Sequence, residues 1–547
     1  MLPYINANEN KTSKIIAFKG LDLRSKADSS TLSKEENISA DSFPAISPRK
    51  SRKTVVEAKN ITFPISPQWD GSSLTDFTGI RDNAFYYRGK KIWGLKEDIP
   101  RTLVDFNGKI CVFPDKLFFD PVLADDALVR MERDITITHA QFYSRMDSVT
   151  GEYVAYIYKK DGGFTNFRTG DSVVISGCET NENNTYTMDD DYSDASNDTI
   201  ISAVVNASDY DRLDLLLYNK NGGKALFKNC TDDGNITIKL SIPQMNNVCV
   251  HNNRLWGTSE DGKYIYASKL GDFLNFNSFQ GLSDDSWYSM VGTPGKFTGI
   301  CSYRSSVVAF KDQCIHHIYG DSPSNFSIPK QTEGGCIDGR SISELGGLLY
   351  YLSPKGFCTY NGGEPLCISP QITTQYTACV SGNDGKRYYT ASYKKDGDCD
   401  VLVYDPTLNL WHREDDTPFI SFFNYGLNFY GATKDCVFEF DTGDSPVEWF
   451  FETQPLTSND STQKGVNCLW LRADTNSDTE IEISISHDNC EFIKCSSLKK
   501  GEAFRCHRIP IRFKKCDSFK IRVEGRGKAV IHGLELFTYQ GGKNYEQ

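Results

Sequence analysis

The sequence predicts an all-β protein, and three observations lead to this prediction. Apolar residues do not recur at helical spacing over three turns anywhere in the chain. Short runs of β-branched and aromatic residues occur throughout and are separated by Gly, Asn and Asp turns. Similar hairpins also recur every 40 to 52 residues, a period typical of β-propeller blades. We therefore expect a β-propeller of about seven blades, with an inserted small β-barrel and a C-terminal β-sandwich.

The propeller is predicted from a repeated unit of apolar strand, polar turn and apolar strand. The clearest unit is LWGTSEDGKYIYAS, which begins at Leu255. Further units begin at Val307, Leu349, Tyr389 and Phe429. Earlier hairpins, FYYRGKKIWGL and ICVFPDKLFF, precede an interruption of the repeat. We therefore assign residues 61–127 and 241–452 to the propeller.

Three other segments depart from this repeat. Residues 128–240 contain separate strands such as FRTGDSVVISGC and DRLDLLLYN, and we expect them to form the inserted barrel. Residues 453–547 contain longer strands such as EIEISISHDNC, of the length that a β-sandwich uses. Residues 1–60 are expected to form an extended N-terminal arm, because Pro44 and Pro48 favour extended backbone before them.

The composition and net charge of the chain limit the classes of function that it can have. The chain has 547 residues and a net charge of −12, whereas proteins that grip DNA through its phosphates are usually basic. An acidic chain suits DNA that must slide past without sticking. The apolar runs are shorter than the ~20 residues of a membrane-spanning helix, and the N-terminus does not predict a secretory signal. The 17 cysteines, an odd number without Cys-x-x-Cys spacing, indicate free thiols.

Sequence motifs of enzymes are missing. There is no Gly-rich phosphate loop, G-x-S-x-G elbow or H-E-x-x-H. We therefore expect no enzyme, and assign no catalytic residue, cofactor or metal. His316 and His317 fall in one predicted strand and should face opposite sides, one packed and one exposed. The acidic run 188–194 lacks the Gly and Glu of an EF-hand loop and should be a solvated loop.

Two short motifs have predicted structural roles. Asp261-Gly262 is close to the Ser-x-Asp-x-Gly turn of sialidase-type propellers but is one residue short. A hairpin turn is the better interpretation, because Asp-Gly supplies the positive φ that such turns need. Arg49, Lys50, Arg52 and Lys53 form the one dense basic run. It would serve either a nucleic-acid contact or, equally well in so acidic a chain, an arm that docks on an acidic neighbouring subunit.

Four stretches of the sequence resemble a known family. They are GLDLRSKADSSTLSKEENISADSFPAISPRKSRKT (20–54), NRLWGTSEDGKYIYASKLGDFLNFNSF (253–279), FTGICSYRSSVVAFKDQCIHHIYGDSPSNFSI (297–328) and FKIRVEGRGKAVIHGLELF (519–537). They are similar to stretches of the β-propeller tail hub or nozzle ("DNA-stabilisation") proteins of tailed bacteriophages. The resemblance covers most of the chain but little of residues 128–240, and its motifs are structural.

The resemblance implies a structural protein of the virion tail, made and assembled in the cytoplasm of the host bacterium. Such proteins typically form sixfold rings below the portal and its adaptor, where they extend the DNA conduit, retain the genome and let it pass. The expected partners are further copies of the chain in a hexameric ring, the portal or adaptor, other tail proteins, double-stranded DNA that passes without specific binding, and the host surface. Two alternatives stay open: a receptor- or glycan-binding propeller at the tail tip, and a peripheral neck or decoration protein.

Overall fold

The computed structural model describes residues 10–57, 59–63, 78–95, 99–123, 128–186, 196, 198–329, 331–457, 463–476, 478–498, 506–511 and 515–540. Strands make up nearly all the regular structure of these residues, which confirms the prediction of an all-β protein. The helices among them are three short 3₁₀ turns, η2 (Phe164–Asn166), η3 (Asn181–Asn183) and η5 (Gly339–Ser341).

None of the described helices is long and apolar enough to cross a membrane.

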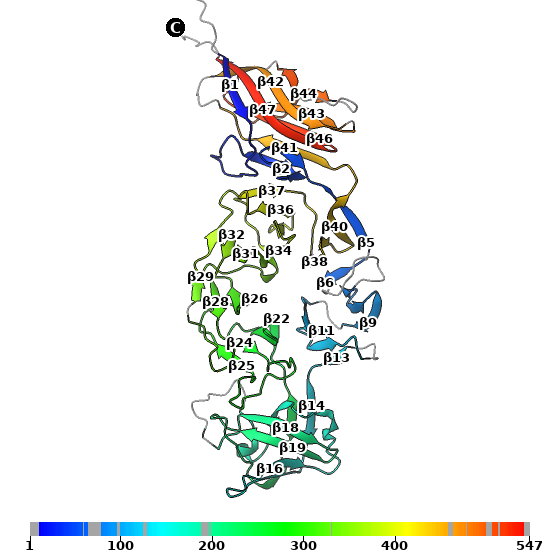
Figure 1. Ribbon diagram of the computed structural model, residues 1–547, viewed down its shortest axis with the longest axis vertical. Coiled ribbons are helices and arrows are strands. Elements are labelled where there is room, and N and C mark those ends of the chain that lie inside the picture. Colours follow the sequence, from blue (N-terminus) through cyan, green and yellow to red (C-terminus); the bar gives the residue numbers. More distant parts are fainter. Residues whose placement is uncertain are drawn as a thin grey trace, which may run out of the picture.

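Seven four-stranded antiparallel sheets of the described chain lie around a ring, which Figure 1 shows face on. In six of them each strand pairs with the next strand along the chain, and in the seventh the outer strand is β5. The seven ring sheets consist of β6 (Ile61–Phe63), β7 (Gly79–Arg81), β8 (Ala84–Tyr87) and β9 (Lys90–Gly94); β10 (Thr102–Phe106), β11 (Lys109–Phe113), β12 (Leu117–Phe119) and β13 (Val129–Arg130); β22 (Met245–His251), β23 (Arg254–Ser259), β24 (Tyr264–Ala267) and β25 (Trp287–Met290); β26 (Phe297–Tyr303), β27 (Ser306–Lys311), β28 (Cys314–Ile318) and β29 (Gln331–Glu333); β30 (Ser343–Leu345), β31 (Leu348–Ser353), β32 (Gly356–Tyr360) and β33 (Leu366–Cys367); β34 (Ala378–Asn383), β35 (Tyr388–Tyr393), β36 (Cys399–Asp405) and β37 (Leu410–Arg413); and β38 (Ser421–Tyr425), β39 (Asn428–Ala432), β40 (Cys436–Gly443) and β5 (Ser51–Glu57).

Apolar side chains are buried between each ring sheet and the next. One such cluster joins Phe357 of β32 to Tyr388 of β35 and Trp411 of β37. Another joins Trp256 of β23 to Val307 of β27. The first strands of neighbouring sheets contact one another, as β22 contacts both β10 and β26, so these strands lie innermost. Sheets that pack face to face around a common axis are the arrangement of a β-propeller.

The ring closes through the N-terminal segment. Strand β5 pairs antiparallel with β40, with Val56 opposite Val437. Both valines pack with Ile61 and Ala84 of the first ring sheet, which joins the last sheet to the first. A strand from before the first ring sheet therefore completes the last one.

This finding corrects the prediction that residues 1–60 form an extended arm. The described part of this segment contributes strands to three sheets: β1 (Asn10–Ile15) pairs with β47, β2 (Leu32–Glu36) with β41, and β5 with β40. A small hairpin of β3 (Ile38–Ser39) and β4 (Ser47–Pro48) lies between them. Apolar residues such as Leu32 and Ile38 are buried, which an arm in solvent would leave exposed.

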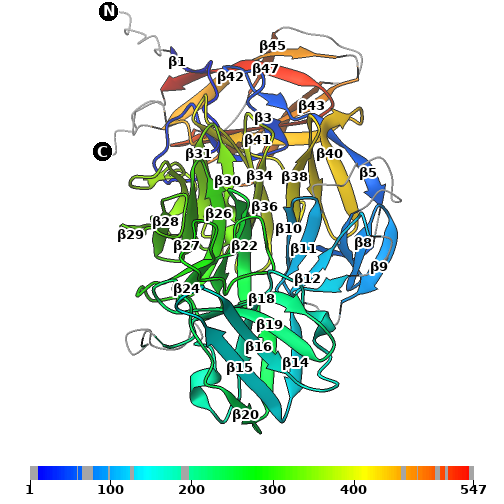
Figure 2. The same cartoon turned by 60° about the horizontal axis from the view of Figure 1, so that its bottom comes forward.

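The segment predicted as an inserted barrel forms one eight-stranded sheet. The strand order is β14-β21-β17-β18-β19-β16-β15-β20, and the inner side chains share one apolar core. This insert lies at the bottom of Figure 2. Its strands are β14 (Arg133–Ile137), β15 (Ala140–Met146), β16 (Tyr153–Tyr158), β17 (Ser172–Ser176), β18 (Ser202–Ser208), β19 (Arg212–Tyr218), β20 (Cys230–Asp232) and β21 (Ile236–Leu240).

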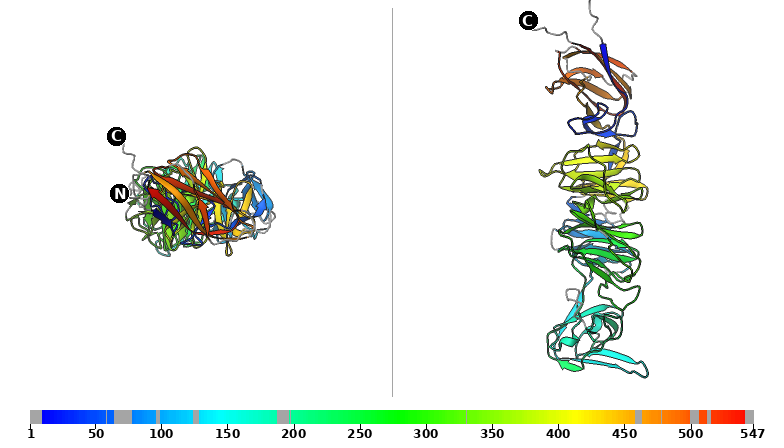
Figure 3. Two further views of the ribbon diagram at one scale, coloured as in Figure 1. Left: turned by 90° about the horizontal axis from the view of Figure 1, so that it is seen from above. Right: turned by 90° about the vertical axis from the view of Figure 1, so that its left-hand side faces the viewer.

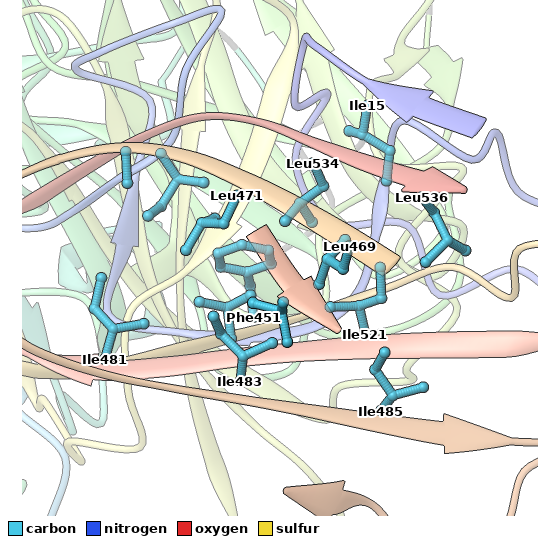
Figure 4. Close-up of a cluster of buried hydrophobic side chains, with 14 of the residues drawn as sticks. Ile15, Phe451, Leu469, Leu471, Ile481, Ile483, Ile485, Ile521, Leu534 and Leu536 are labelled. Carbon is cyan, nitrogen blue, oxygen red and sulfur yellow. The ribbon is translucent and has the colours of Figure 1, made fainter. Parts of the chain in front are cut away.

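The C-terminal part consists of two sheets that share a core. Figure 4 shows Leu469 and Leu534 on one sheet, with Phe451 and Ile483 on the other, packed into that core. The two sheets contain β1, β47 (Ala529–Gln540), β42 (Lys464–Thr475) and β45 (His507–Pro510), and β2, β41 (Glu448–Thr453), β46 (Phe519–Arg526), β43 (Glu480–His487) and β44 (Ile493–Leu498). Because β41 belongs here, the last ring strand ends at Gly443, earlier than the predicted boundary at residue 452.

The three parts lie in a row. In the right-hand view of Figure 3, the C-terminal sheets and the insert occupy opposite ends of the long axis, with the ring between them. Strands β1 and β47 pair with each other at the C-terminal end. The N-terminal segment therefore runs from the C-terminal sheets onto the ring.

Ring closure predicts the effect of a substitution on β5. We expect Val56→Ala to lower the free energy of unfolding by about 2 kcal/mol, because Val56 is 1% exposed in the closing cluster and its loss leaves a cavity. Urea denaturation followed by tryptophan fluorescence measures this. The matched control is Lys53→Ala, an exposed position on the same strand, which should change stability by less than about 0.5 kcal/mol. Equal effects of the two substitutions would show that β5 does not close the ring.

Candidate functional site: the seam between the N-terminal segment and the ring

The candidate functional site is a row of charged side chains where the N-terminal segment crosses the outer edge of a ring sheet. We call it the seam: Glu35, Glu36, Arg49 and Arg52 on the N-terminal side, with Asp400 and residues 412–415 on the ring side. The backbone fixes the approach, since the Leu21 amide donates to the Trp411 carbonyl at 2.8 Å. At Gly20, with φ of +73°, a Cβ would lie 2.5 Å from the Trp411 oxygen, so this crossing requires glycine.

Glu35 places a carboxylate in the interior of the seam. Its side chain is 0% exposed, and the Arg413 amide donates to its Oε1 at 2.9 Å. His412 Nδ1 lies 3.1 Å from the same oxygen. An unpaired carboxylate at this depth would cost several kcal/mol. Glu35 on β2 therefore needs the end of β37 as its partner.

Arg413 extends the seam on both sides. Its Nε donates to Asp400 Oδ1 at 2.9 Å, and its Nη1 lies 3.2 Å from Glu36 Oε2. Burial by itself lowers the pKa of Arg413, but the hydrogen bond and charge of Asp400 outweigh it, so the pKa is raised. Burial likewise raises the pKa of Asp400, but Lys394 and Arg413 outweigh it, so that pKa is lowered. Both groups stay charged at neutral pH.

Arg49 and Arg52 bind two carboxylates of the ring. Arg52 lies 2.5 Å from Glu414 Oε2 and 2.8 Å from Asp415 Oδ2, and its guanidinium lies 4.8 Å from the ring centroid of Phe419. Arg49 lies 3.1 Å from Asp415 Oδ2. Burial raises the pKa of Asp415, but the charges of Arg52 and Arg49 outweigh it, and the pKa is lowered.

These contacts leave only part of the predicted docking arm (Arg49, Lys50, Arg52 and Lys53) available to a neighbouring subunit. The two arginines are bound within the chain, whereas Lys50 and Lys53 are exposed. Alternation along the strand explains the difference between Arg52 and Lys53, because successive side chains of β5 point to opposite faces.

A further arginine ties the same segment to the ring. Arg387 lies 2.6 Å from Asp41 and 3.1 Å from Asp405. Beside it opens a cleft of about 740 Å³ whose wall includes Phe43 and Leu408. Two carboxylates occupy the guanidinium, so the cleft presents no free cation from Arg387 to a ligand.

The charged side chains of the seam are better suited to holding the N-terminal segment on the ring than to acid–base catalysis. A general acid or base works best with a pKa near the operating pH. The carboxylates Asp400 and Asp415 instead have lowered pKa values and are held ionised by arginines. Within the described residues, no group of three or more His, Cys, Asp and Glu side chains could hold a metal ion.

Asp261 and Gly262 form the turn between β23 and β24. Asp261 Oδ1 accepts from the Ser259 hydroxyl at 2.6 Å and from the Lys263 amide at 3.0 Å. Gly262 has φ of +78°, and its carbonyl accepts from Nζ of the buried Lys311 at 2.7 Å. The turn thus has a structural role, tying one ring sheet to the next.

The connection that follows β24 attaches the insert to the ring, which sequence reasoning missed. Asn275 Oδ1 accepts from the Ser172 amide at 2.6 Å, and the Asn277 carbonyl accepts from the Ser172 hydroxyl at 2.6 Å. Asn275 and Asn277 stand in the stretch NFNSF, whose alternating asparagines are the one signal that could have pointed to buried polar contacts.

Two other sequence predictions concern polar residues. His316 and His317 are both buried, at 3% and 7% exposure, so the prediction that one is exposed is wrong. The reason is that β28 is covered on both faces: His316 bonds to Thr293 at 2.8 Å, while His317 bonds to Ser306 on the other side at 2.5 Å. The acidic run 188–194 lies outside the described residues.

Comparison with solved structures gives remote likenesses. No family model and no curated protein matches the chain. The solved structures include an exo-β-1,3-galactanase from Phanerochaete chrysosporium, 9% identical, covering 53% of this chain and 95% of its own, with a TM-score of 0.21. The N-terminal domain of Nup159 is also 9% identical and covers 68% of this chain and 97% of its own, with a TM-score of 0.22. Scores this low carry no argument about the function of this chain.

The seam predicts how stability depends on Asp415. We expect Asp415→Asn to lower the free energy of unfolding at pH 7 by about 3 kcal/mol, since it leaves the charges of Arg49 and Arg52 to share the single carboxylate of Glu414. The pKa of Asp415 is lowered in the folded protein, so its contribution is present above the unfolded value of about 3.9 and is lost as pH falls through the folded pKa. Urea denaturation at several pH values should therefore show the wild type and the variant converging below about pH 4.

The control for this substitution is Glu182→Gln, which removes an exposed ion pair with Lys228. Because this pair is exposed to solvent, the substitution should leave the urea denaturation curve almost unchanged at every pH. A loss of stability in Asp415→Asn that is no larger than that of the control would contradict the assignment of Asp415 to a stabilising seam.

The turn predicts a contrast between two glycines. At Gly262 a Cβ would lie 2.3 Å from the Gly295 carbonyl oxygen, whereas at Gly385, with φ of +84°, it would meet nothing within 4 Å. We expect Gly385→Ala to cost about 1–2 kcal/mol from positive φ alone, and Gly262→Ala to cost clearly more. Thermal denaturation of both variants measures the difference. Similar costs would mean that the turn is not packed against the neighbouring sheet.

Proposed function

We propose that the protein is a structural component of a bacteriophage virion, a tail hub or nozzle protein that forms part of the DNA conduit below the portal or adaptor. In this role it retains the packaged genome and later lets it pass. The observation that carries the proposal is the seam, in which buried ion pairs hold the N-terminal segment across the C-terminal sheets and the ring. The four stretches that resemble phage tail proteins support it.

The finer architecture belongs to the same proposal. The seven ring sheets are the blades of a seven-bladed propeller, the eight-stranded sheet is an inserted barrel, and the two C-terminal sheets form a sandwich. Each propeller blade packs on two neighbours, and such discs are rigid and offer large faces for docking.

A conduit component must keep its shape while DNA under pressure moves past it. Buried ion pairs suit that requirement, because they are satisfied in only one relative placement of their partners. Arg52 with Glu414 and Asp415 fixes the N-terminal segment on the ring, and Asn275 with Ser172 fixes the insert. The contacts at both ends of the ring favour one stiff body over three hinged ones.

The charge of the chain fits the proposed lumen. With a net charge of −12, the protein as a whole repels the phosphate backbone of DNA and does not hold the DNA in place. Six copies around a central axis would surround the DNA with negative charge. We therefore propose passage without specific binding, assembly in the host cytoplasm, and contacts with the portal or adaptor and with other tail proteins.

The exposed part of the basic run has a place in this proposal. Lys53 lies on β5, the outer strand of the sheet that closes the ring, and Lys50 directly precedes this strand. The arginines beside them are already paired. We propose that these two lysines contact an acidic face of the neighbouring copy.

Particles provide the test. Electron microscopy of virions and quantitative mass spectrometry should place the protein in a ring at the tail, in a copy number that is a multiple of the tail symmetry. The double variant Lys50→Glu/Lys53→Glu should fold normally but fail to complete the ring, whereas Lys395→Glu, an exposed lysine elsewhere on the ring, should assemble like the wild type. Absence of the protein from virions would refute the proposal. Normal assembly of the double variant would remove the two lysines from it.

A further inference from the structure

The thiols of the chain differ in one geometric respect. All 17 cysteines are free. Among the paired strands of the described residues, a single pair of cysteines stands directly opposite each other, Cys358 of β32 and Cys367 of β33. The remaining cysteines on paired strands face other residue types, as Cys436 faces Glu57 and Cys379 faces Ser392.

The hydrogen bonds of β32 and β33 show which kind of pair this is. The Ile368 amide donates to the Phe357 carbonyl at 2.9 Å, one position outside the cysteines on each strand. In an antiparallel ladder the next pair along is a non-hydrogen-bonded pair, whose Cα atoms lie about 4.5 Å apart with their side chains close together. Disulfides need Cα atoms about 4.4–6.8 Å apart. The backbone therefore already satisfies the Cα separation of a disulfide.

The two sulfur atoms are close but unequal in their surroundings. The Cys358 thiol is buried and interacts with the thiol of Cys367. Cys367 is half-buried on β33, the two-residue outer strand of its sheet, next to the exposed Leu366. Its thiol lies 3.6 Å from the Lys355 carbonyl oxygen. A small reagent in solution therefore reaches Cys367 more readily than Cys358.

We propose that Cys358 and Cys367 form a site of reversible oxidation that closes to an intramolecular disulfide in exchange with a small-molecule disulfide such as glutathione disulfide. The Cys367 thiolate attacks one sulfur of glutathione disulfide, forms a mixed disulfide and releases one glutathione thiolate. Cys358 then loses its proton and attacks the Cys367 sulfur, which releases the second glutathione. Two protein thiols and one glutathione disulfide thus give one protein disulfide and two glutathione thiols.

The order of these two steps follows from burial. Burial raises the pKa of Cys358 to about 12, so its thiolate is scarce and it is a poor first nucleophile. Once the mixed disulfide stands opposite Cys358, the second attack is intramolecular and gains from proximity. The resulting bond would tie β33, which the ladder holds through only two residues, to the body of its sheet. The proposal does not depend on the role in the virion.

The experiment uses the purified full-length chain, first reduced and then incubated with glutathione disulfide. Free thiols are then blocked, and the unreduced protein is digested with trypsin and chymotrypsin. Cleavage after Tyr360 places the two cysteines on separate peptides. Mass spectrometry should find the Cys358 peptide joined to the Cys367 peptide. Dithiothreitol should separate them.

Three variants decide the outcome. Cys358→Ser and Cys367→Ser should each lose the joined peptide completely, and Cys358→Ser should instead accumulate glutathione on Cys367. Cys436→Ser, which removes a half-buried cysteine opposite Glu57, should keep the joined peptide at the wild-type level. Hydrogen exchange should also slow on oxidation around residues 356–368 in the wild type. Glutathione retained on wild-type Cys367 without the joined peptide, or free thiols at both positions, would overturn the proposal.

Discussion

The pairing of β5 with β40 is the interaction on which the rest of the structure depends. This ladder and the cluster around Val56 bind the last sheet of the ring to the segment of chain that leads into the first sheet. Before reaching β5, the chain has already contributed β1 and β2 to the C-terminal sheets. Ring closure, the seam and the C-terminal core are therefore coupled, because one short segment takes part in all three.

The ion pairs of the seam fix how the N-terminal segment lies on the ring more than they raise the net free energy of unfolding. Burying Glu35, Arg52 and Asp415 costs solvation that their mutual attraction only partly returns. The charges allow only one placement of the N-terminal segment, because a shift of that segment by one residue would leave a buried carboxylate beside the wrong neighbour. The apolar clusters between ring sheets tolerate small adjustments better, because dispersion contacts have little directionality.

The parts of the fold that could be predicted are those that depend on residues close together in the sequence. The alternation around Leu255 and Ile265 and the Asp261-Gly262 turn define a hairpin without reference to distant residues. The fate of Arg52 could not be predicted in this way, because its partner Glu414 lies 362 residues away and PRKSRK reads as an exposed basic run. The contact of Asn275 with Ser172 spans 103 residues and was missed for the same reason. The local pattern of apolar and polar residues predicts strands and turns. Contacts between residues far apart in the sequence decide which charged side chains are buried.

The position of β1 and β47 has a consequence for synthesis on the ribosome. Strand β1 pairs with β47, and β2 pairs with β41, so β1 and β2 wait without these partners until the strands of the C-terminal sheets have been translated. A chain that stops before β41 would lack the partner of β2 and the core that Phe451 fills. Exposed strand edges and apolar surface mark such a product for aggregation or proteolysis. The pairing of β1 with β47 and of β2 with β41 thus separates copies that contain the C-terminal sheets, which can fold, from copies that lack them.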